Sequence, residues 1–430
     1  MVAWTGGGEV AKLRVMATPR PELQTIDVEA LIVGGGLVGL TLASALAGAG
    51  LPVAVVDRVA PEATVAPEFD GRATAIAHAS ARVLQGVGLW EGVAPYASAI
   101  NDIRVSDGDS LLFLHYDHRE VGDEPLGHII ENRYLRLAMI ERARSLDALE
   151  FLAPMEIAEI TRTSTGVVAE LADGRQIKAR LLLACDGRNS SIREAAGIGV
   201  TRLPYNQTSI VCAVFHDRPH NNVAHERFLP GGPFAILPMQ DVDGRRRSAI
   251  VWSERDDLVP ALMALDEAAF VAEMGPRFGD ILGALELAGA RWSHPLSLSH
   301  AHSYVGQRLA LVGDAAHAIH PIAGQGLNMG IRDIAALAEV IIDARRLGRD
   351  IGAPDILAEY ERWRRFDNMV LAVVTDVITR MFSNDVTPLR VARSVGLGAV
   401  NRIAPLRRNL MRHAMGTVGD LPRLVRGEAL

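Results

Sequence analysis

The sequence is poor in cysteine: its 430 residues contain only Cys185 and Cys212. Two cysteines cannot build a disulfide framework, and their separation fits no metal or redox motif. We expect both to be small buried residues in a protein of the reducing cytoplasm. Metal ligands are scarce as well, because His317 and His320 lie three residues apart with no third ligand nearby. The sequence therefore predicts no metal site, and we expect structural roles for both histidines.

The sequence also lacks a membrane span or a secretory signal. Residues 30–56 carry no charged side chain and are long enough to imitate a transmembrane helix. Six glycines and Pro52 interrupt this run, so we interpret it as strand, turn, helix and strand. Residues 1–26 contain no hydrophobic segment that would direct secretion. We expect a flexible N-terminal extension there, with Met16 as an alternative start to Met1.

Other signatures are missing too. We find no internal repeat, no low-complexity segment and no Gly-x-Ser-x-Gly elbow, so the sequence indicates neither a repeat protein nor a hydrolase of that type. Hydrophobic residues make up 49% of the chain and charged residues 22%. Such a composition is typical of a globular protein of two or three domains.

The charge is unevenly distributed. The net charge of −7 gives no reason to expect nucleic-acid binding. From Thr375 onward, however, there are nine arginines and four acidic residues, a net charge of +5. This basic helical tail predicts contact with a membrane surface or a partner protein, or else a solvated helical face packed on the core. The sequence leaves both readings open.

Two glycine-rich stretches indicate nucleotide chemistry. In the first, a strand over residues 30–33 leads into a Gly-x-Gly-x-x-Gly turn, a helix, and a second strand that ends at Asp57. In this dinucleotide fingerprint, the three glycines allow a tight turn, let the pyrophosphate approach the backbone and let the helix pack closely on the strand. The acidic residue at the end of the second strand hydrogen-bonds a ribose. The fingerprint does not choose between FAD and NAD. The residues expected to contact the dinucleotide are Gly34, Gly36, Leu37, Val38, Gly39 and Asp57.

The second stretch, residues 309–333, indicates a strand, an acidic turn, a glycine-rich loop and a helix. Asp314 directly follows the strand, where a carboxylate can accept hydrogen bonds from sugar hydroxyls. Gly324, Gly326 and Gly330 remove side chains and so allow backbone N–H groups to approach a flat ligand. The helix N-terminus carries partial positive charge, which suits an anionic or electron-accepting ring.

The run His320-Pro-Ile-Ala-Gly-Gln-Gly-Leu-Asn-Met-Gly-Ile-Arg-Asp333 resembles the signature of the ubiquinone-biosynthesis hydroxylases, a family of FAD-dependent aromatic monooxygenases. The resemblance extends over nearly the whole chain. It implies FAD as the cofactor, NADH or NADPH as a transient hydride donor, O2 as co-substrate and a hydrophobic prenylated phenol as substrate. In this stretch it implies cofactor contacts from Gly313, Asp314, Pro321, Gly324, Gln325, Gly326, Leu327 and Asn328.

Three shorter motifs fit the same resemblance. Asp70-Gly-Arg72 looks like the family pattern in which the arginine lies near the flavin or its phosphates, although a lone arginine is more often a surface ion-pair residue. Arg133, at the start of a predicted helix, corresponds to a polar residue that contacts the flavin side in relatives. Asp186-Gly187 follows a strand and resembles the family's Asp-Gly motif, which is associated with FAD and nicotinamide binding.

We therefore predict an α/β fold: an FAD-binding, Rossmann-like doubly wound domain with an inserted, mostly β substrate domain and a helical C-terminal tail. The FAD-binding domain is expected over residues 27–100, 125–200 and 295–370, the substrate sheet over 101–124 and 201–294, and the basic tail over 371–430. Beyond Pro354, four large residues recur at helical spacing, and we expect them in the core. They are Tyr360, Trp363, Phe366 and Met369.

The predicted function is hydroxylation of the aromatic ring of a polyprenylated phenol in ubiquinone biosynthesis. The resemblance implies that FAD does the oxygen chemistry, while the protein positions the ring and excludes water. Three alternatives stay open: a hydroxylase of a soluble phenolic acid, a non-catalytic FAD-bound organiser of a quinone-biosynthesis complex, and a flavin reductase of prenyl double bonds. No catalytic residue can be assigned. We expect a cytoplasmic location, with the tail as a route to the inner face of the membrane and to other quinone-biosynthesis proteins.

Overall fold

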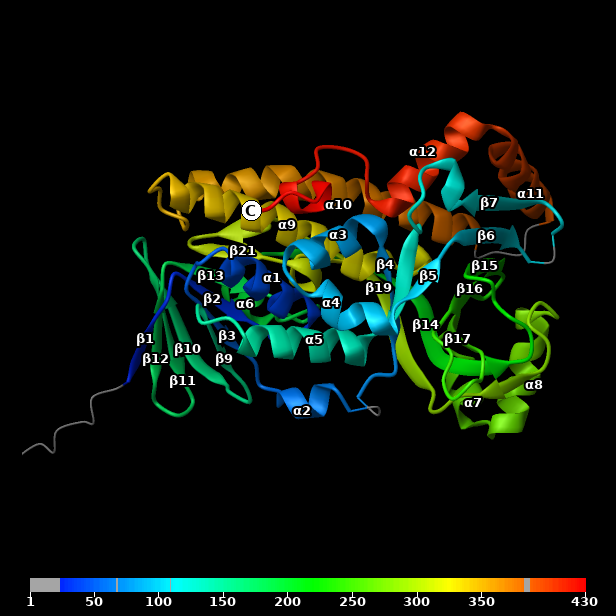
Figure 1. Cartoon of the computed structure of the whole chain (residues 1–430), viewed down its shortest axis with the longest axis horizontal. Coiled ribbons are helices and arrows are strands. Elements are labelled where there is room, and N and C mark those ends of the chain that lie inside the picture. The colour runs from blue at the N-terminus through cyan, green and yellow to red at the C-terminus, as the bar shows by residue number, and fades with distance from the viewer. Residues whose placement is uncertain (1–23, 67–68, 109, 383–386) are drawn as a thin grey trace, which may run out of the picture.

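The first half of the molecule is built on a six-stranded, mainly parallel sheet (Figure 1). The computed structural model describes residues 24–66, 69–108, 110–382 and 387–430, so most of the predicted N-terminal extension lies outside the described residues. Strands buried on both faces are continuous apolar runs, as in the segments ALIV, VAVV and LLLA. In sheet order the strands are β20 (Val305–Gly306), β21 (Leu309–Leu311), β13 (Leu181–Ala184), β2 (Ala30–Val33), β3 (Val53–Val56) and β9 (Leu149–Leu152).

Helices and a smaller sheet enclose this core. Helix α1 (Leu37–Gly48) packs against both α5 (Asn132–Arg144) and α9 (Gln325–Arg346). Residues 39–47 of α1 are all buried, which explains why the helix is apolar on every side. A four-stranded sheet packs on the same core and comprises β1 (Thr25–Asp27), β12 (Gln176–Ala179), β11 (Val167–Leu171) and β10 (Ile157–Arg162).

A nine-stranded sheet forms the second half. The long strand β14 (Val200–His216) pairs with β17 (Arg247–Arg255) and β19 (Trp292–Ala301). β15 (Val223–Leu229) pairs in parallel with β6 (Asp102–Asp107), so distant parts of the chain share one sheet. The other strands are β7 (Phe113–Asp117), β16 (Gly232–Pro238), β18 (Leu285–Leu287) and β22 (His317–Ala318). One face packs on α7 (Val259–Ala264) and α8 (Glu267–Phe278).

Short elements fill the space between the two halves. The three-stranded sheet β4-β8-β5 packs against the large sheet and comprises β4 (Ala73–Ala77), β8 (Gly127–Glu131) and β5 (Ser98–Ile100). The remaining short helices are α2 (Pro61–Thr64), α3 (His78–Gly86), α4 (Trp90–Val93) and α6 (Ser191–Ala195).

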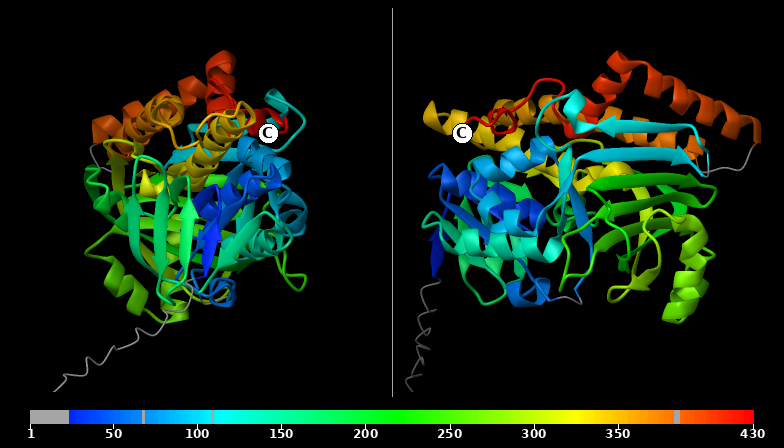
Figure 2. Two further views of the ribbon diagram at one scale, coloured as in Figure 1. Left: turned by 90° about the vertical axis from the view of Figure 1, so that its left-hand side faces the viewer. Right: turned by 45° about the vertical axis from the view of Figure 1, so that its right-hand side comes forward.

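The C-terminal helices lie along one side of both halves (Figure 1). Helix α10 (Pro354–Phe382) packs on α9, and α11 (Thr387–Arg402) and α12 (Ala404–Met415) lie over β6 and β7 (Figure 2). The last helix, α13 (Arg423–Arg426), returns to α3 and α9. No helix in the described ranges is long and apolar enough to cross a bilayer.

The expected core of α10 forms only in part. Tyr360 is fully buried and Trp363 is half-buried, but Phe366 is 65% exposed and Met369 is 42% exposed. The prediction was wrong for the last two because steps of three residues drift around a helix by about 60° each. The side chains that face inward at this level are Arg364 and Asn368.

Candidate functional site

A continuous cavity of about 1290 Å³ lies between the two halves. Its walls come from the starts of α1 and α9, strand β4, one face of the large sheet and helices α10–α12. Ordinary small-ligand pockets measure roughly 300–1,000 Å³. This cavity therefore has room for a large ligand, or for two.

Most of the predicted cofactor residues line this cavity. Those that line it are Gly36, Leu37, Val38, Asp57, Arg72, Gly187, Asp314, Pro321, Gly324, Gln325, Gly326, Leu327 and Asn328. Those that do not are Gly34, Gly39, Arg133, Asp186 and Gly313.

Gly34 and Gly39 shape the turn before α1. Gly34 has a φ of +103°, and a Cβ there would lie 2.4 Å from the carbonyl oxygen of Cys185. A Cβ on Gly39 would lie 1.8 Å from the carbonyl oxygen of Gly34. Both positions need glycine because the backbone is crowded. These two residues therefore serve the cavity indirectly, by fixing the turn.

Asp57 ends β3 beside this turn. Its carboxylate accepts hydrogen bonds from the backbone N–H of Gly35 at 2.5 Å and of Val59 at 2.7 Å. A carboxylate oxygen can accept more than one hydrogen bond. Asp57 is thus held in place while retaining capacity for the hydroxyls of a ligand.

Asn328 fastens the start of α9 to β4. Its side-chain oxygen accepts from the N–H of Ala77 at 2.9 Å, and its Nδ2 donates to the carbonyls of Ala75 and Gly324, both at 2.8 Å. Gly324 has a φ of +62°, and a Cβ there would lie 2.8 Å from the Cβ of Ala75. The glycine-rich loop is therefore rigidly shaped by its own contacts.

The starts of α1 and α9 both present open N-termini to the cavity. Neither N-cap residue, Gly36 or Gly324, forms a side-chain cap, and neither first turn contains an acidic residue. A Cβ on Gly36 or Gly326 would meet no atom within 4 Å. Such helix ends carry partial positive charge and free N–H groups, which favour phosphate or an anionic ring. These residues fit a dinucleotide with an electron-accepting ring.

The acidic turn after β21 has two functions. A Cβ on Gly313 or on Gly330 would lie 3.0 Å from Cγ2 of Val38, so both glycines allow the turn and α9 to pack closely on α1. Gly330 thus packs inward, contrary to the expectation that it faces a ligand. Asp314 is exposed and lines the cavity. Its carboxylate forms no hydrogen bond or ion pair with the part of the chain that the structure describes.

A buried network centred on Asp333 was not predicted as part of the site. Its carboxylate contacts His317 Nε2 at 2.5 Å and accepts from Arg364 Nε at 3.0 Å and Asn368 Nδ2 at 2.9 Å. It also accepts from the N–H of Gly313 at 3.3 Å. Burial raises the pKa of Asp333, but His317, Arg364 and Asn368 outweigh it and hold the pKa at about 2. The network ties the cofactor-side turn to α9 and α10.

Arg136, rather than Arg133, reaches the cavity. Arg72 Nη2 lies 2.9 Å from Asp70, and Arg136 also bonds the Asp70 carboxylate. Burial raises the pKa of Asp70, but these two guanidinium groups hold it at about 2. Arg133 instead lies 4.4 Å above the Tyr134 ring and 3.4 Å from Glu131.

Arg133 does not line the cavity, so its contact with the cofactor stays a prediction. Arg136 lies three residues after Arg133 on α5 and lines the cavity, whereas the Arg133 side chain contacts Tyr134 and Glu131 instead.

Asp186 and Gly187, although neighbours in sequence, have different surroundings. The Asp186 carboxylate accepts from the N–H of Ile192 at 3.2 Å, at the start of α6. It therefore stabilises a helix N-terminus outside the cavity. Gly187, with a φ of +83°, lines the cavity where a Cβ would meet no atom within 4 Å.

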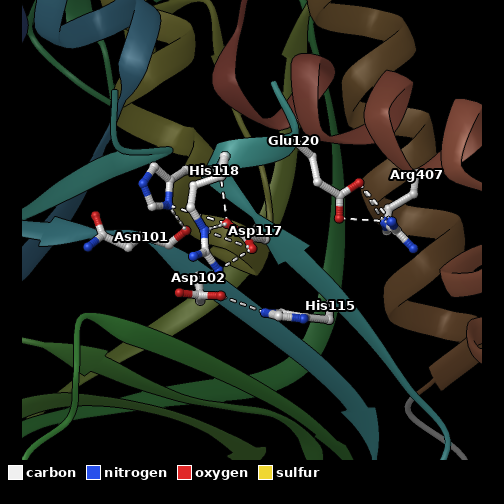
Figure 3. Close-up of polar contacts among 8 residues, drawn as sticks. Asn101, Asp102, His115, Asp117, His118, Glu120 and Arg407 are labelled. Carbon is white, nitrogen blue, oxygen red and sulfur yellow. Dashed lines mark hydrogen bonds and ion pairs between the residues drawn. The ribbon is translucent and has the colours of Figure 1, made fainter. Parts of the chain in front are cut away.

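The far end of the cavity is apolar and is closed by α11 and α12. Leu397, Val400, Leu410, Met411 and Met415 line this end. Figure 3 shows how α12 is attached: Arg407 donates to Glu120, with Nη2 at 2.7 and 2.8 Å from the two carboxylate oxygens. The backbone N–H of His115 also donates to the Asn401 side chain at 2.9 Å.

Burial shifts the pKa values of both cysteines and of His320. Cys212 is buried, and burial raises its pKa to about 12. Burial also raises the pKa of Cys185, so neither thiol ionises readily. His320 is fully buried, which lowers its pKa to about 4. No group of three or more His, Cys, Asp or Glu residues within the described ranges is arranged to hold a metal.

The chain is similar to FAD-dependent proteins over most of its length. Residues 27–372 match the family model described as "FAD binding domain". The chain is 51% identical to "Ubiquinone hydroxylase UbiL" of Rhodospirillum rubrum over 94% of this chain and 93% of that protein. It is 33% identical to "3-demethoxyubiquinol 3-hydroxylase" of Escherichia coli K12, over 90% of this chain and 98% of that protein.

The fold is also that of solved flavoprotein monooxygenases. The crystal structure of p-nitrophenol 4-monooxygenase PnpA from Pseudomonas putida superposes with a TM-score of 0.75, covering 91% of this chain and 99% of that one. The sequence identity is 21%, so this likeness concerns the fold alone.

Proposed function

We propose that this chain, which belongs to the FAD-dependent monooxygenases that include the ubiquinone-biosynthesis hydroxylases, hydroxylates the aromatic ring of a polyprenylated phenol in that pathway. The observation that best supports this substrate is that the cavity is continuous. One space runs from the two open helix ends to an apolar end under α11 and α12. A polar ring with a long apolar tail matches this change of character.

The residues at the first end would hold FAD. Gly36, Leu37 and Val38 at the start of α1 suit the pyrophosphate, and Asp57 suits a ribose. The start of α9 suits the flavin ring, since its helix end is positive and its glycines leave space. Further contacts are assigned to Arg72, Gly187, Asp314, Pro321, Gly324, Gln325, Gly326, Leu327 and Asn328.

The division of labour follows from this arrangement. When bound, FAD accepts hydride from NADH or NADPH and allows one oxygen atom of O2 to be transferred to the ring. The chain orients the phenol, and its apolar walls exclude water from the reacting ring. The buried Asp333 network keeps the turn after β21 and the start of α9 in a fixed relation.

Oxygen uptake tests this function. The purified FAD-loaded protein should consume O2 and NAD(P)H with a short-chain prenylated phenol, and mass spectrometry should find one added oxygen atom. A strain lacking the protein should accumulate a prenylated phenol short of one hydroxyl. Turnover with soluble phenolic acids alone would favour the soluble-substrate alternative. No turnover with any phenol would favour the organiser, and turnover without O2 would favour a reductase.

We also propose that α10–α12 contact a lipid surface, because a long-tailed phenol resides in membranes. The outward face of α10 carries a stripe of large apolar side chains, with Val373 57% exposed and Val377 54% exposed. Next to it, α11 and α12 expose Arg402, Arg408 and Arg412, which form no ion pair with the described residues. Apolar exposure beside positive charge fits anionic lipid headgroups. The stripe comprises Phe366, Met369, Val370, Val373, Val374, Val377 and Met381.

Flotation with vesicles tests this contact. The protein should bind vesicles of phosphatidylglycerol and phosphatidylethanolamine, and the double variant Val373→Asp, Val377→Asp should bind them much less. Leu347→Asp is the matched control, since Leu347 is exposed at the end of α9, away from the stripe. Equal binding by all three proteins would refute the proposal. A stripe variant that instead changes the sedimentation mass would identify an interface between copies.

A further inference from the structure

Among the described residues of the large sheet, Glu226 on β15 is the acidic side chain that lines the cavity. Across the sheet, Glu226 is paired with Ala235 on β16 and with Val105 on β6. The same row continues through aliphatic residues on the strands beyond. All members of the row line the cavity: Val211, Val251, Ala235, Glu226, Val105 and Leu114. An ionisable group therefore stands in an otherwise apolar row.

Nothing in the described part of the chain satisfies this carboxyl. The Glu226 side chain forms no hydrogen bond and no ion pair there. Removal from water raises the pKa of Glu226 to about 7, and no neighbouring charge or hydrogen bond contributes to the shift. The Glu226 residue is half-buried, and it forms part of the cavity wall. A carboxyl placed among apolar side chains with no protein partner is partly desolvated, which is unfavourable for folding. Such a group is typically retained where a ligand completes it.

Other titratable groups also line the cavity, among them His294 on β19, whose pKa is lowered by burial and by the nearby Arg72 and Arg188. Arg393 on α11 forms an ion pair with Asp107, and its Nε lies 3.0 Å from the carboxylate. Burial raises the pKa of Tyr116, on β7, to about 12, and lowers the pKa of His225 to about 4, so neither changes charge near neutral pH. Five further charged residues line the cofactor end: Asp57, Arg72, Arg136, Arg188 and Asp314.

We propose that Glu226 contacts the phenol hydroxyl of the substrate, orients the ring, and accepts the hydroxyl proton during oxygen transfer. This inference rests on the proposed function. As the phenol O–H bond breaks, its proton passes to the Glu226 carboxylate, and the electron pair enriches the ring carbons ortho and para to the oxygen. A C–O bond forms at such a carbon. That carbon then loses its hydrogen to solvent as a proton, and Glu226 returns its proton to the phenol oxygen.

The co-substrates that the family uses supply the remaining atoms and electrons of the reaction. O2 supplies the oxygen atom that enters the ring, and its second atom leaves as water. NADH or NADPH supplies the two electrons. Glu226 is unchanged at the end of the cycle, so its contribution is limited to proton transfer and orientation.

Variants at position 226 test the proposal by measuring how much of the NAD(P)H that is oxidised leads to hydroxylated product. We expect Glu226→Gln to keep its FAD and to oxidise NAD(P)H, but to form product about 100-fold more slowly, with H2O2 released instead. Glu226→Asp should recover part of the coupling. The rise of the wild-type rate through about pH 7 should be absent in Glu226→Gln. Equal coupling and an equal pH profile in wild type and Glu226→Gln would overturn the proposal.

Binding supplies a readout that does not depend on turnover. In anaerobic titrations, wild type should bind the prenylated phenol more tightly than its methyl ether, and Glu226→Gln should not distinguish the two. Glu226→Leu should unfold at a temperature no lower than wild type, because it removes an unpartnered carboxyl. A large loss of stability in Glu226→Leu would assign Glu226 a structural role instead. If wild type hydroxylates no prenylated phenol, the proposed function fails, and the same ether comparison with the phenol it does use decides the role of Glu226.

Discussion

Replacing Asp333 by asparagine should destabilise the FAD-binding half far more than the same change at Asp367. Both carboxylates contact Arg364, Asp333 at 3.0 Å from Nε and Asp367 at 3.2 Å from Nη1. They differ in burial, because the Asp333 side chain is fully buried whereas that of Asp367 is 50% exposed. Comparing the two variants therefore isolates the effect of burying the carboxylate, because both carboxylates contact the same guanidinium group.

The structure sets the size of the effect. Removing one partner of a buried ion pair costs roughly 3–5 kcal/mol because the other charge stays buried. Exposed ion pairs contribute about 0–1 kcal/mol. At about 2 °C per kcal/mol, Asp333→Asn should lower the unfolding temperature by roughly 6–10 °C and Asp367→Asn by no more than about 2 °C. Both values assume that the half unfolds cooperatively.

The pH dependence gives the effect a direction. Since the pKa of Asp333 is lowered to about 2 from an ordinary 3.8, its ionised form stabilises the fold above pH 3.8. This contribution is lost as the pH falls through about 2. Fluorimetric unfolding between pH 7 and pH 2, with and without added FAD, measures it. If both variants lose the same few degrees, the network has no role in holding the turn and α9 together.

Three further substitutions follow from the geometry. Gly326→Ala should leave the FAD-free protein as stable or up to about 1 kcal/mol more stable, because alanine favours a helix, yet weaken FAD binding by filling open space. Gly324→Ala should destabilise the FAD-free protein itself, since its φ is +62° and Ala75 lies 2.8 Å from the added carbon; unfolding and FAD titration of both variants measure the contrast, and equal behaviour contradicts it. Glu120→Gln should loosen α12 by weakening the contact to Arg407, raising the KM for a prenylated phenol several-fold while FAD affinity stays the same. An unchanged KM in steady-state assays would argue against α12 as a wall of the substrate site.

The motifs of the sequence were sufficient for the family and the fold. The resemblance inferred from residues 320–333 is confirmed by the family match, and the α/β class by the solved structures. Spacing predicted the turns because a fingerprint is a local backbone shape. It did not tell which glycines face the ligand. Gly34 and Gly313 pack against backbone and Val38, whereas Gly36 opens onto the cavity.

The substrate end could not be predicted from one sequence. The row that contains Glu226 is set by the register of β15 with β6, and these strands lie more than a hundred residues apart. Nothing local to either strand fixes that pairing. Arg136 was missed because it lies three residues after Arg133 on nearly the same face of α5, and the sequence does not show which of the two arginines bonds Asp70.

The arginines of the basic tail fall into two groups. Arg393 and Arg407 point inward and pair with Asp107 and Glu120, so these two arginines pack the tail onto the large sheet. Arg402, Arg408 and Arg412 are exposed and form no ion pair with the described residues. A net charge counts both kinds alike, whereas the structure separates them by the direction of each side chain. The inward pairs fasten α11 and α12 over the apolar end of the cavity, and the outward arginines lie on the solvent side of the same helices.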